Sequence, residues 1–368
     1  MLKKDAAYSK NYLDADVVEI VERLASEVHA LAGKTVVFTG AGGFLGGHFM
    51  AVFDYLNQRV LKRPARVLAY DNFVASATTA EALKVHRSIE FLEKNVTDSA
   101  PVVDGKVDYV FHAAGIASPI WYRTHPMETL EVATFGTRNM LNLAREHGAS
   151  FLYFSSSEIY GDPDIRHVPT SESYAGHVSC RGARACYDEG KRVGETMCDI
   201  YHNTYGVRTI AVRPFNVYGP GLRERDYRVL PSFASRIKAG RSVDVFGTGN
   251  QTRTFCYVTD AVVGIILAIL KGVPGEAYNI GNPDPEISMI ELAERVQAVL
   301  GPQVAYRVID YPDGYPSVEP QRRCPNIQKA QLHLEFEPIV TLEDGLARFF
   351  NWTNANYTGI GGGAADHR

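Results

Sequence analysis

Short apolar runs alternate along this chain with longer stretches in which apolar residues recur at helical spacing. Runs of about four to eight apolar residues bounded by turn residues predict buried strands, and helical spacing predicts amphipathic helices. The predicted strands are Thr35–Thr39, Arg66–Tyr70, Ile89–Leu92, Val107–His112, Phe151–Phe154 and Thr209–Val212. The clearest helices between them are Glu128–His147 and Tyr187–Tyr205. This rhythm predicts an α/β fold with a Rossmann-type, doubly wound parallel sheet.

The two ends of the chain depart from this rhythm. Residues 17–31 carry a helical apolar stripe, which predicts an N-terminal helical extension over residues 1–32, packed on the body or on a partner. After residue 215 the alternation loosens, and Ser288 and Glu291 form a capping box at the start of a later helix. We therefore expect a Rossmann domain over 33–215 with later strands contributing, a smaller C-terminal α/β domain mainly over 216–355, and a flexible tail over 356–368.

Composition excludes several classes of protein. The net charge is −4 over 368 residues, which does not favour a nucleic-acid partner. We find neither a run of eighteen apolar residues, which would suggest a membrane span, nor an N-terminal apolar segment typical of a signal peptide. The five cysteines are scattered and form no CxxC pair, so we expect free thiols, no metal site and a cytoplasmic location.

A glycine motif follows the first predicted strand. Gly40, Gly43 and Gly46 form GxxGxxG between a strand and a helix, where a pyrophosphate can approach the backbone and the helix N-terminus. Asp71 ends the second predicted strand, where a carboxylate can accept hydrogen bonds from ribose hydroxyls and would repel a 2′-phosphate. The pair predicts NAD rather than NADP as cofactor.

Tyr187 and Lys191 are four positions apart on a predicted helix, so their side chains share a face. A lysine beside a phenol is expected to lower the tyrosine pKa and make the phenolate a usable base. Alone, the pair is more typical of an ordinary helix face. Ser156, at the carboxyl end of a predicted strand, adds a hydroxyl that can hydrogen-bond a substrate. Together with the nucleotide motif, the three residues predict a hydride-transfer site with Tyr187 as base.

Longer segments carry a resemblance to a known family. The chain resembles the extended short-chain dehydrogenases/reductases that act on nucleotide sugars, and within them most resembles the UDP-glucuronate decarboxylases, or UDP-xylose synthases. The resemblance covers roughly residues 33–352, and "ACYDEGKR" and "QTRTFCYV" are its most diagnostic segments. The others are "GAGGFLG", "DNF", "HAAGIASPIWY", "SSSEIYGDP", "RPFNVYGPG", "YNIGNP" and "EPQRRCPNI".

The resemblance implies a set of site residues and a reaction. Implied NAD contacts are Gly40, Gly43, Phe44, Leu45, Gly46, Asp71, Asn72, Asn95, Val96, Ala113, Tyr187 and Lys191. Implied substrate contacts are Pro119, Tyr122, Glu158, Asn216, Arg253 and Arg323, the last two facing the uronate and the diphosphate. Implied catalytic residues are Ser156, Ser157, Glu158, Tyr187, Lys191 and Arg253. The implied reaction oxidises C4 of UDP-glucuronate, releases CO₂ and gives UDP-xylose or its 4-keto pentose.

The two residues that follow Ser156, which are Ser157 and Glu158, distinguish related activities of this family. Nucleotide-sugar 4,6-dehydratases usually carry an aspartate where this chain has Ser157, and a serine does not serve readily as the acid for dehydration. The 4-epimerases generally lack a glutamate at Glu158. A dehydratase or epimerase of the same family stays open as an alternative, as does a nucleotide-binding regulator without turnover.

Other positions depart from the family pattern. Ala133 stands where an asparagine is usual, Asn95 replaces an aspartate that reads the adenine, and "SCRGAR" precedes the catalytic helix.

The resemblance also implies a homodimer in which the two long helices pair across a two-fold axis. Apolar residues available for that contact are Leu130, Met140, Leu141, Val193, Met197 and Ile200.

Overall fold

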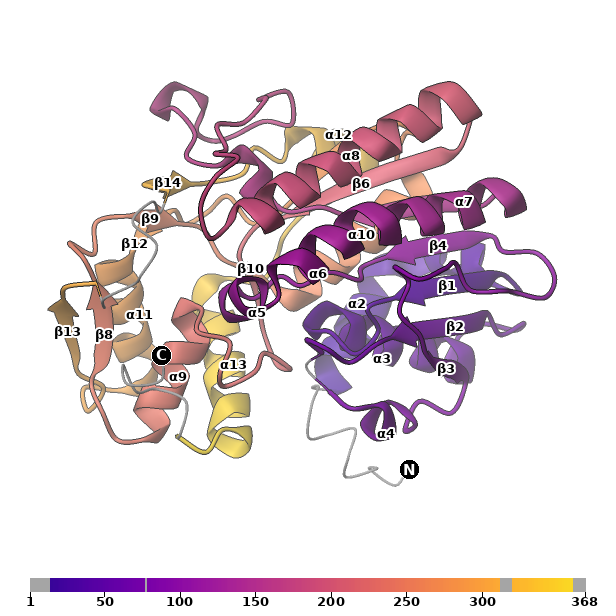
Figure 1. Cartoon of the computed structure of the whole chain (residues 1–368). Helices are drawn as coiled ribbons and strands as arrows, with labels where there is room; N and C mark the ends of the chain where they lie inside the picture. Colours follow the sequence, from indigo (N-terminus) through magenta and orange to yellow (C-terminus); the bar gives the residue numbers. More distant parts are fainter. Residues whose placement is uncertain (1–13, 77, 312–319, 360–368) are drawn as a thin grey trace.

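The computed structural model describes residues 14–76, 78–311 and 320–359. Its centre is a seven-stranded sheet in the order β11-β6-β5-β4-β1-β2-β3, and every neighbouring pair is parallel (Figure 1). The strands are β1 (Thr35–Thr39), β2 (Arg66–Asp71), β3 (Ile89–Glu93), β4 (Tyr109–His112), β5 (Ser150–Phe154), β6 (Arg208–Pro214) and β11 (Ala277–Ile280). The predicted doubly wound parallel sheet is confirmed, with strand ends within two residues of those expected.

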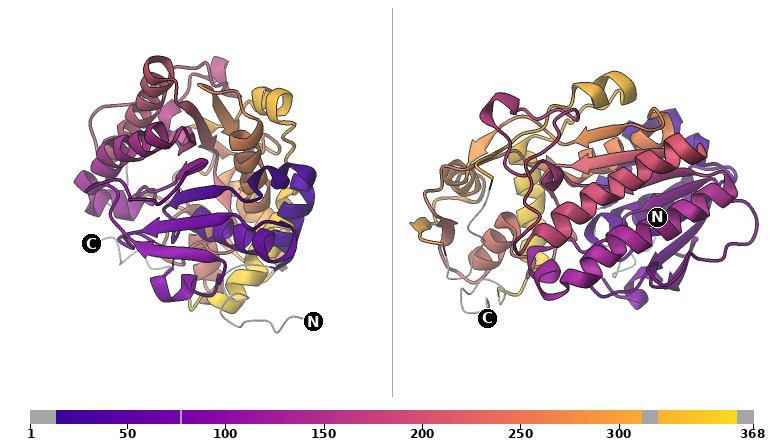
Figure 2. Two further views of the ribbon diagram at one scale, coloured as in Figure 1. Left: turned by 90° about the vertical axis from the view of Figure 1, so that its right-hand side faces the viewer. Right: turned by 45° about the horizontal axis from the view of Figure 1, so that its top comes forward.

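Successive residues of β1 show how the sheet is covered on both faces. Val36 and Phe38 belong to the same hydrophobic core as residues of α3 (Phe44–Arg59), α10 (Val258–Lys271) and α2 (Asp14–Leu24). Val37 points to the opposite face and packs with α7 (Thr137–His147) and α8 (Ala185–Tyr205). Because side chains alternate along a strand, a continuous apolar run buries both faces of a parallel sheet. Figure 2 shows α7 and α8 lying side by side on their face of the sheet.

The predicted long helices are interrupted or shifted at their ends. The stretch Glu128–His147 forms α6 (Pro126–Glu131), a π-helical turn η2 (Val132–Gly136) and α7. The predicted helix at Tyr187 begins two residues earlier, at Ala185. The remaining elements of this half are α4 (Ala80–Leu83), α5 (Pro119–Thr124), η3 (Ser157–Tyr160) and η4 (Ile165–His167).

The N-terminal extension packs on the body of the molecule. Its apolar stripe is buried, but the α-helix α2 ends at Leu24 and continues as a 3₁₀ helix η1 (Ala25–Leu31). α2 lies against α3 and α10. The Tyr257 hydroxyl donates to Asp16 Oδ2 at 2.7 Å, and Arg23 pairs with Asp260 at 2.7 Å. Residues 1–13 of the expected extension and 360–368 of the expected tail lie outside the described residues.

The chain after residue 215 builds smaller sheets beside the carboxyl ends of the large one. β8 (Val243–Phe246) pairs with β13 (Tyr306–Ile309), and β7 (Val217–Tyr218) pairs with β10 (Cys256–Tyr257). β9 (Thr252–Arg253) lies between β12 (Ile287–Ser288) and β14 (Arg322–Arg323). The helices are α9 (Val229–Lys238), α11 (Met289–Leu300), α12 (Gln328–Leu334) and α13 (Leu342–Asn356). The capping box of Ser288 and Glu291 is confirmed at the start of α11.

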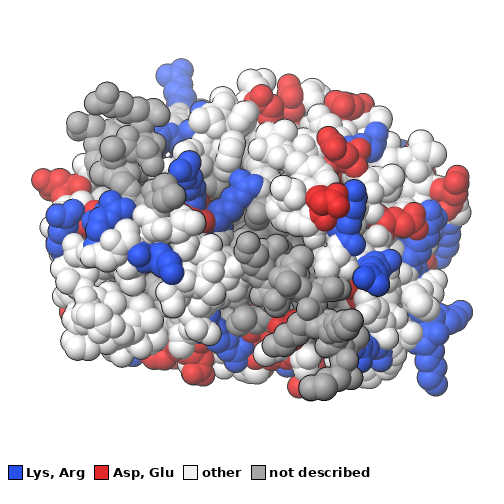
Figure 3. All heavy atoms as spheres, turned by 90° about the horizontal axis from the view of Figure 1, so that it is seen from below, with Lys and Arg blue, Asp and Glu red and all other residues white. Residues whose placement is uncertain are grey.

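The expected boundary near residue 215 is crossed by one strand, because β11 returns to pair with β6 at the edge of the large sheet. The predicted Rossmann domain allows for such a later strand, and the division into domains itself stays a prediction. On the face shown in Figure 3, lysine and arginine side chains are interspersed with acidic ones. Among the described residues, no helix is both long and apolar enough to span a membrane.

Candidate active site

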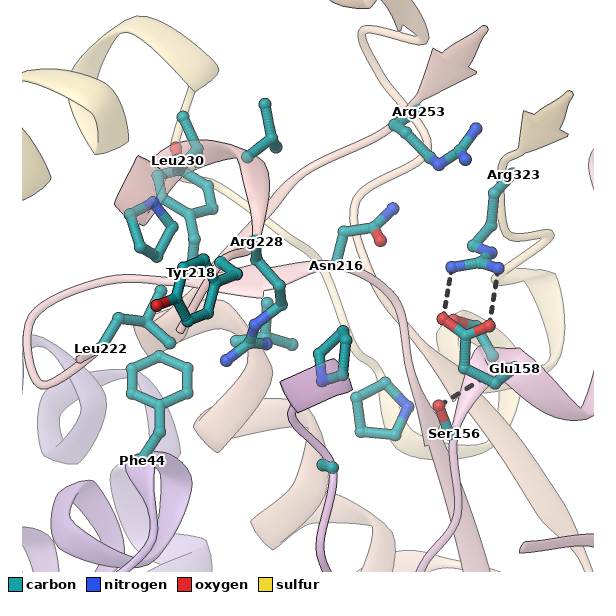
Figure 4. A pocket seen from close by; sticks show the side chains of 18 of the residues that line it. Phe44, Ser156, Glu158, Asn216, Tyr218, Leu222, Arg228, Leu230, Arg253 and Arg323 are labelled. Carbon is teal, nitrogen blue, oxygen red and sulfur yellow. Dashed lines mark hydrogen bonds and ion pairs between the residues drawn. The ribbon is translucent and has the colours of Figure 1, made fainter. Parts of the chain in front are cut away.

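A cavity of about 420 Å³ opens at the carboxyl ends of β1, β4, β5 and β6, where the C-terminal segments cover the sheet (Figure 4). Such strand ends are where ligands bind in open α/β sheets. The cavity is lined by these predicted site residues: Gly40, Gly43, Phe44, Leu45, Gly46, Ala113, Pro119, Tyr122, Ser156, Ser157, Glu158, Tyr187, Lys191, Asn216, Arg253 and Arg323. Asp71, Asn72, Asn95 and Val96 lie outside its lining.

The glycine turn packs so closely against neighbouring backbone that no side chain fits there. Gly40 has φ +79°, and a Cβ there would lie 2.7 Å from the Ala113 carbonyl carbon. A Cβ on Gly46 would lie 2.2 Å from the Gly40 carbonyl oxygen. α3 begins at Phe44, and the preceding Gly43 provides no side-chain cap for its first N–H groups. An uncapped helix N-terminus beside bare backbone fits the pyrophosphate of a dinucleotide.

Asp71 is oriented by the turn that it follows. Its carboxylate accepts from Gly42 N at 2.8 Å, Phe73 N at 2.7 Å and Ser76 Oγ at 2.5 Å. These contacts hold the carboxylate beside the glycine turn, the position expected for a ribose contact. The Asn95 side chain accepts from Thr97 N in a local turn, so its role toward an adenine stays a prediction.

The prediction that Lys191 lowers the pKa of Tyr187 is wrong in this structure. Lys191 Nζ donates to the Phe154 carbonyl oxygen at 2.6 Å and lies 5.8 Å from the centroid of the Tyr187 ring. Burial raises the pKa of Tyr187 to about 12, although a hydrogen bond with Ser156 acts in the opposite direction. Burial also lowers the pKa of Lys191 to about 8. Helical spacing puts the two residues on one face, but the lysine reaches past the phenol to the end of β5.

Tyr187 is nevertheless held in place by its neighbours. Its ring stacks on Tyr122 with centroids 5.5 Å apart and an interplanar angle of 18°. Ser156 caps η3 by accepting from Glu158 N at 3.2 Å, which fixes the serine at the end of β5. The structure therefore brings together Ser156, Tyr187 and Lys191 as the sequence predicts.

Glu158 is the acceptor of an arginine cluster. Arg323 donates to both of its carboxylate oxygens, at 2.6 and 2.8 Å, and Arg184 pairs with Oε2. Burial alone would raise the pKa of Glu158, but the charges of Arg323 and Arg184 outweigh it and lower the pKa. Glu158 is therefore ionised near neutral pH. Arg323, expected at a diphosphate, here holds Glu158, so its diphosphate role stays a prediction.

Arg253 and Asn216 lie beside this cluster. Arg253 is buried on β9, its Nη1 donates to the Thr252 carbonyl at 2.8 Å, and its charge helps to lower the pKa of Glu158. Asn216 has φ +39°, and its Nδ2 donates to the Thr254 carbonyl at 2.8 Å, tying the end of β6 to the segment after Arg253. Figure 4 shows Arg253, Arg323 and Asn216 above Glu158.

Two buried polar atoms at the cavity have no hydrogen-bond partner among the described residues. They are Ser155 Oγ and Arg323 Nε, and both residues line the cavity. Buried polar atoms are normally hydrogen-bonded, so such atoms are typical of a site that receives a polar ligand.

Sequence reasoning missed two arginines that line the cavity, Arg184 and Arg228. Arg184 lies three residues before Tyr187, so its place on the same helix was an available signal. Arg228 is paired with Asp226 and acts on the charge of Tyr187. It lies in the charge-rich segment "RERDYR", which is typical of a surface loop and gives no such signal.

The departure at Ala133 has a packing consequence. Ala133 is buried in the π-helical turn, and a Cβ on Gly190 of α8 would lie 3.0 Å from the Ala133 Cβ. The π-helical turn and α8 therefore approach each other closely through small residues.

Residues 36–281 match the family described as the NAD dependent epimerase/dehydratase family. The chain belongs to this family. A UDP-glucuronic acid decarboxylase 6 of Arabidopsis thaliana is 38% identical over 312 residues, which cover 84% of this chain and 86% of that protein. A UDP-glucuronic acid decarboxylase 1 of Xenopus tropicalis is 37% identical over 320 residues, covering 87% of this chain and 72% of the relative.

A solved structure shows the same fold. It is a UDP-glucuronic acid 4-epimerase of Bacillus cereus in complex with UDP-glucuronic acid and NAD, 22% identical, with a TM-score of 0.70. The alignment covers 88% of this chain and all of that one. Membership of an NAD dependent family agrees with the glycine turn and Asp71, and NAD is the cofactor of this chain.

Proposed function

We propose that this chain is an NAD-dependent decarboxylase that converts UDP-glucuronate to UDP-xylose or its 4-keto pentose. The observation that carries the proposal is one cavity that joins Ser156, Tyr187 and Lys191 to an arginine cluster around Glu158. The first group suits oxidation of a sugar hydroxyl, and the second suits a substrate with a carboxylate. Relatives with 37–38% identity are UDP-glucuronic acid decarboxylases.

The first step is oxidation at C4 of the uronate. NAD⁺, when bound, would supply the hydride acceptor and a positive charge that favours a phenolate. Tyr187, in its phenolate form, takes the proton of the C4 hydroxyl, and Ser156 donates a hydrogen bond to the same oxygen. Lys191, whose ammonium donates to the Phe154 carbonyl, would hold the ribose of the cofactor. The product of this step is a 4-keto uronate.

Decarboxylation follows because the carboxylate now lies β to a ketone. The C5–carboxylate bond breaks, CO₂ leaves, and the electron pair passes into an enolate whose oxygen lies beside Ser156 and Tyr187. C5 then takes a proton. Tyr187 returns its proton to the C4 oxygen, and the reduced cofactor would return the hydride to C4, which would give UDP-xylose. Release of the sugar nucleotide before that return would give the 4-keto pentose.

Arginines of the cluster bind the substrate, and Glu158 transfers protons. Arg253 binds the uronate carboxylate, since a guanidinium can bind a carboxylate through two parallel hydrogen bonds. Glu158, ionised because of Arg323 and Arg184, takes a proton from solvent and passes it to C5, with Ser157 helping. Asn216 and Arg323 contact the diphosphate, and Pro119 and Tyr122 lie near the sugar.

The assembly is a homodimer through α6–α7 and α8. Exposed apolar side chains on these helices support it: Met127, Phe135, Val193, Ile200 and Tyr205. Met140 and Leu141, expected at this contact, are buried inside the monomer. The chain works in the cytoplasm, in keeping with five free cysteines.

The test is the mass of the sugar nucleotide after incubation with NAD⁺ and UDP-glucuronate, with UDP-glucose as a neutral control. The proposal expects a pentose or 4-keto pentose from UDP-glucuronate. Loss of water would indicate a dehydratase, an unchanged mass with altered retention an epimerase, and tight NAD binding without turnover a regulator.

A further inference from the structure

Asp188 is a buried acid with no part in the proposed reaction. It follows Tyr187 on α8 and is 8% exposed. Its Oδ2 lies 3.5 Å from Nε of Arg184, one helical turn earlier. Its Oδ1 is buried and has no hydrogen-bond partner among the described residues. A buried carboxylate with one long contact is poorly compensated for its loss of water.

Arg184 also faces a second acid. The same guanidinium pairs through Nη2 with Glu158, which lies on η3 and lines the cavity. Glu158 in turn receives both terminal nitrogens of Arg323. Arg184 therefore lies between two carboxylates that belong to different elements, and Glu158 is much the better satisfied of the two.

We propose that Asp188 is a positioning residue that competes with Glu158 for Arg184. When Asp188 is ionised, it draws the guanidinium toward α8 and weakens its hold on Glu158. When Asp188 is protonated, that attraction is lost, and Arg184 neutralises Glu158 more fully. Asp188 thereby sets how basic Glu158 is, without itself lining the cavity.

The charges around Asp188 place this change near neutral pH. Burial and the charge of Glu158 raise the pKa of Asp188 to about 7, while Arg184 and Arg323 act in the opposite direction. The pKa of Glu158 is lowered, so Glu158 stays ionised while Asp188 titrates. The titratable and charged groups that act on Asp188, or on which it acts, are Glu158, Arg184, Arg323, Tyr122, Cys186 and Tyr187.

A kinetic test, which rests on the proposed function, compares pH profiles of kcat for UDP-glucuronate, because C5 takes its proton after CO₂ has left. We expect kcat of the wild type to rise about three- to tenfold as pH rises through about 7, because ionised Asp188 makes Glu158 bind more readily the proton that it passes to C5. Asp188→Asn removes this rise and stays at the low-pH value. Asp188→Glu keeps a rise, at a shifted pH. Asp199→Asn, at an exposed position of the same helix, keeps the wild-type profile.

A second measurement needs no turnover. In the NAD⁺-loaded protein, ¹³C carboxyl resonances of aspartate are titrated for wild type, Asp188→Asn and Asp199→Asn. We expect one aspartate that titrates near neutral pH and is missing only from Asp188→Asn. If Asp188→Asn does not fold, a changed titration in Asp188→Glu supports the proposal and an unchanged one contradicts it.

The kinetic test and the carboxyl titration can contradict the proposed function and the role of Asp188 independently of each other. A wild type that does not convert UDP-glucuronate contradicts the proposed function, and the carboxyl titration then decides the role of Asp188 alone. A neutral titration or a pH-dependent rise that persists in Asp188→Asn overturns the inference.

Discussion

Arg253 and Arg323 are register partners in the parallel strands β9 and β14. Paired residues of neighbouring strands project from the same face of a sheet, so the two guanidiniums leave this small sheet on one side. Both residues line the cavity, and Glu158 lies against them from the end of β5 (Figure 4). Two short strands that are far apart in the chain thus concentrate positive charge on one carboxylate.

Replacing Arg253 tests whether this charge serves a uronate. Arg253→Ala should lower kcat/KM for UDP-glucuronate about ten- to a hundredfold, because a hydrogen bond to a charged group is lost. Binding of UDP-glucose, which lacks the carboxylate, should change much less. Calorimetry with both nucleotide sugars gives the ratio of the two losses in binding affinity. Arg322→Ala is the matched control: Arg322 neighbours Arg323 on β14 but pairs with Glu286, outside the cavity lining. Equal losses on both sugars in Arg253→Ala would give that arginine a structural role.

Glu158→Gln tests the division between oxidation and proton handling. The variant keeps the shape but removes the ionised group, so CO₂ release should slow about 10²- to 10⁴-fold, the usual range for a lost acid–base group. KM for UDP-glucuronate should not rise, because Arg253, which binds the uronate carboxylate, is unchanged and Arg323 loses its internal partner Glu158 and is left for the diphosphate. NADH absorbance should still appear in a single turnover. A raised KM with unchanged kcat would place Glu158 in binding alone.

The sequence predicted the parts of this site that local spacing governs. The glycine turn, Asp71 at the end of β2, and Ser156 at the end of β5 follow from strand–turn–helix order and are found where expected. The meeting of Ser156 with Tyr187 and Lys191 rested on the order of strands, which the alternating pattern favours.

The predictions that failed depend on which atom the end of a long side chain contacts. The spacing of Tyr187 and Lys191 fixed a shared helix face but did not show that the lysine nitrogen bonds to the Phe154 carbonyl. Nor could it show that the charges around Glu158 would include Arg184, since that contact depends on the tertiary placement of η3 against α8. The close approach of Ala133 to Gly190 likewise depends on how the π-helical turn packs against α8.

The buried Asp16 predicts a pH dependence of stability. Burial raises the pKa of Asp16 from 3.8 to about 6, despite hydrogen bonds from Tyr257 and Arg348. The folded state therefore favours the protonated acid, and the free energy of unfolding should fall as pH rises between those values, by roughly 1–3 kcal/mol. Asp16→Asn should lack this fall, whereas Asp14→Asn, at an exposed position of the same helix, should keep it. Urea unfolding at a series of pH values measures it, and parallel curves for wild type and Asp16→Asn would contradict it.

Assembly through α8 predicts a position-specific effect. Ile200 is 47% exposed on α8, and burying a charge in a two-fold interface repeats the penalty in both protomers. Ile200→Asp should therefore give a monomer in light scattering at micromolar concentration, where the wild type should be a dimer. Leu332 on α12 is more exposed still, and Leu332→Asp should leave the dimer intact. A wild-type monomer, or dissociation by both variants alike, would exclude this interface.

The most direct measurement follows ¹³CO₂ from UDP-glucuronate labelled at C6 and incubated with NAD⁺ and the protein. We predict labelled CO₂ in step with a UDP-pentose or its 4-keto form, and release slowed about 10²- to 10⁴-fold in Tyr187→Phe, which still binds NAD⁺. If the label stays in the sugar nucleotide while the wild type converts UDP-glucuronate to another product, the chain is not a decarboxylase.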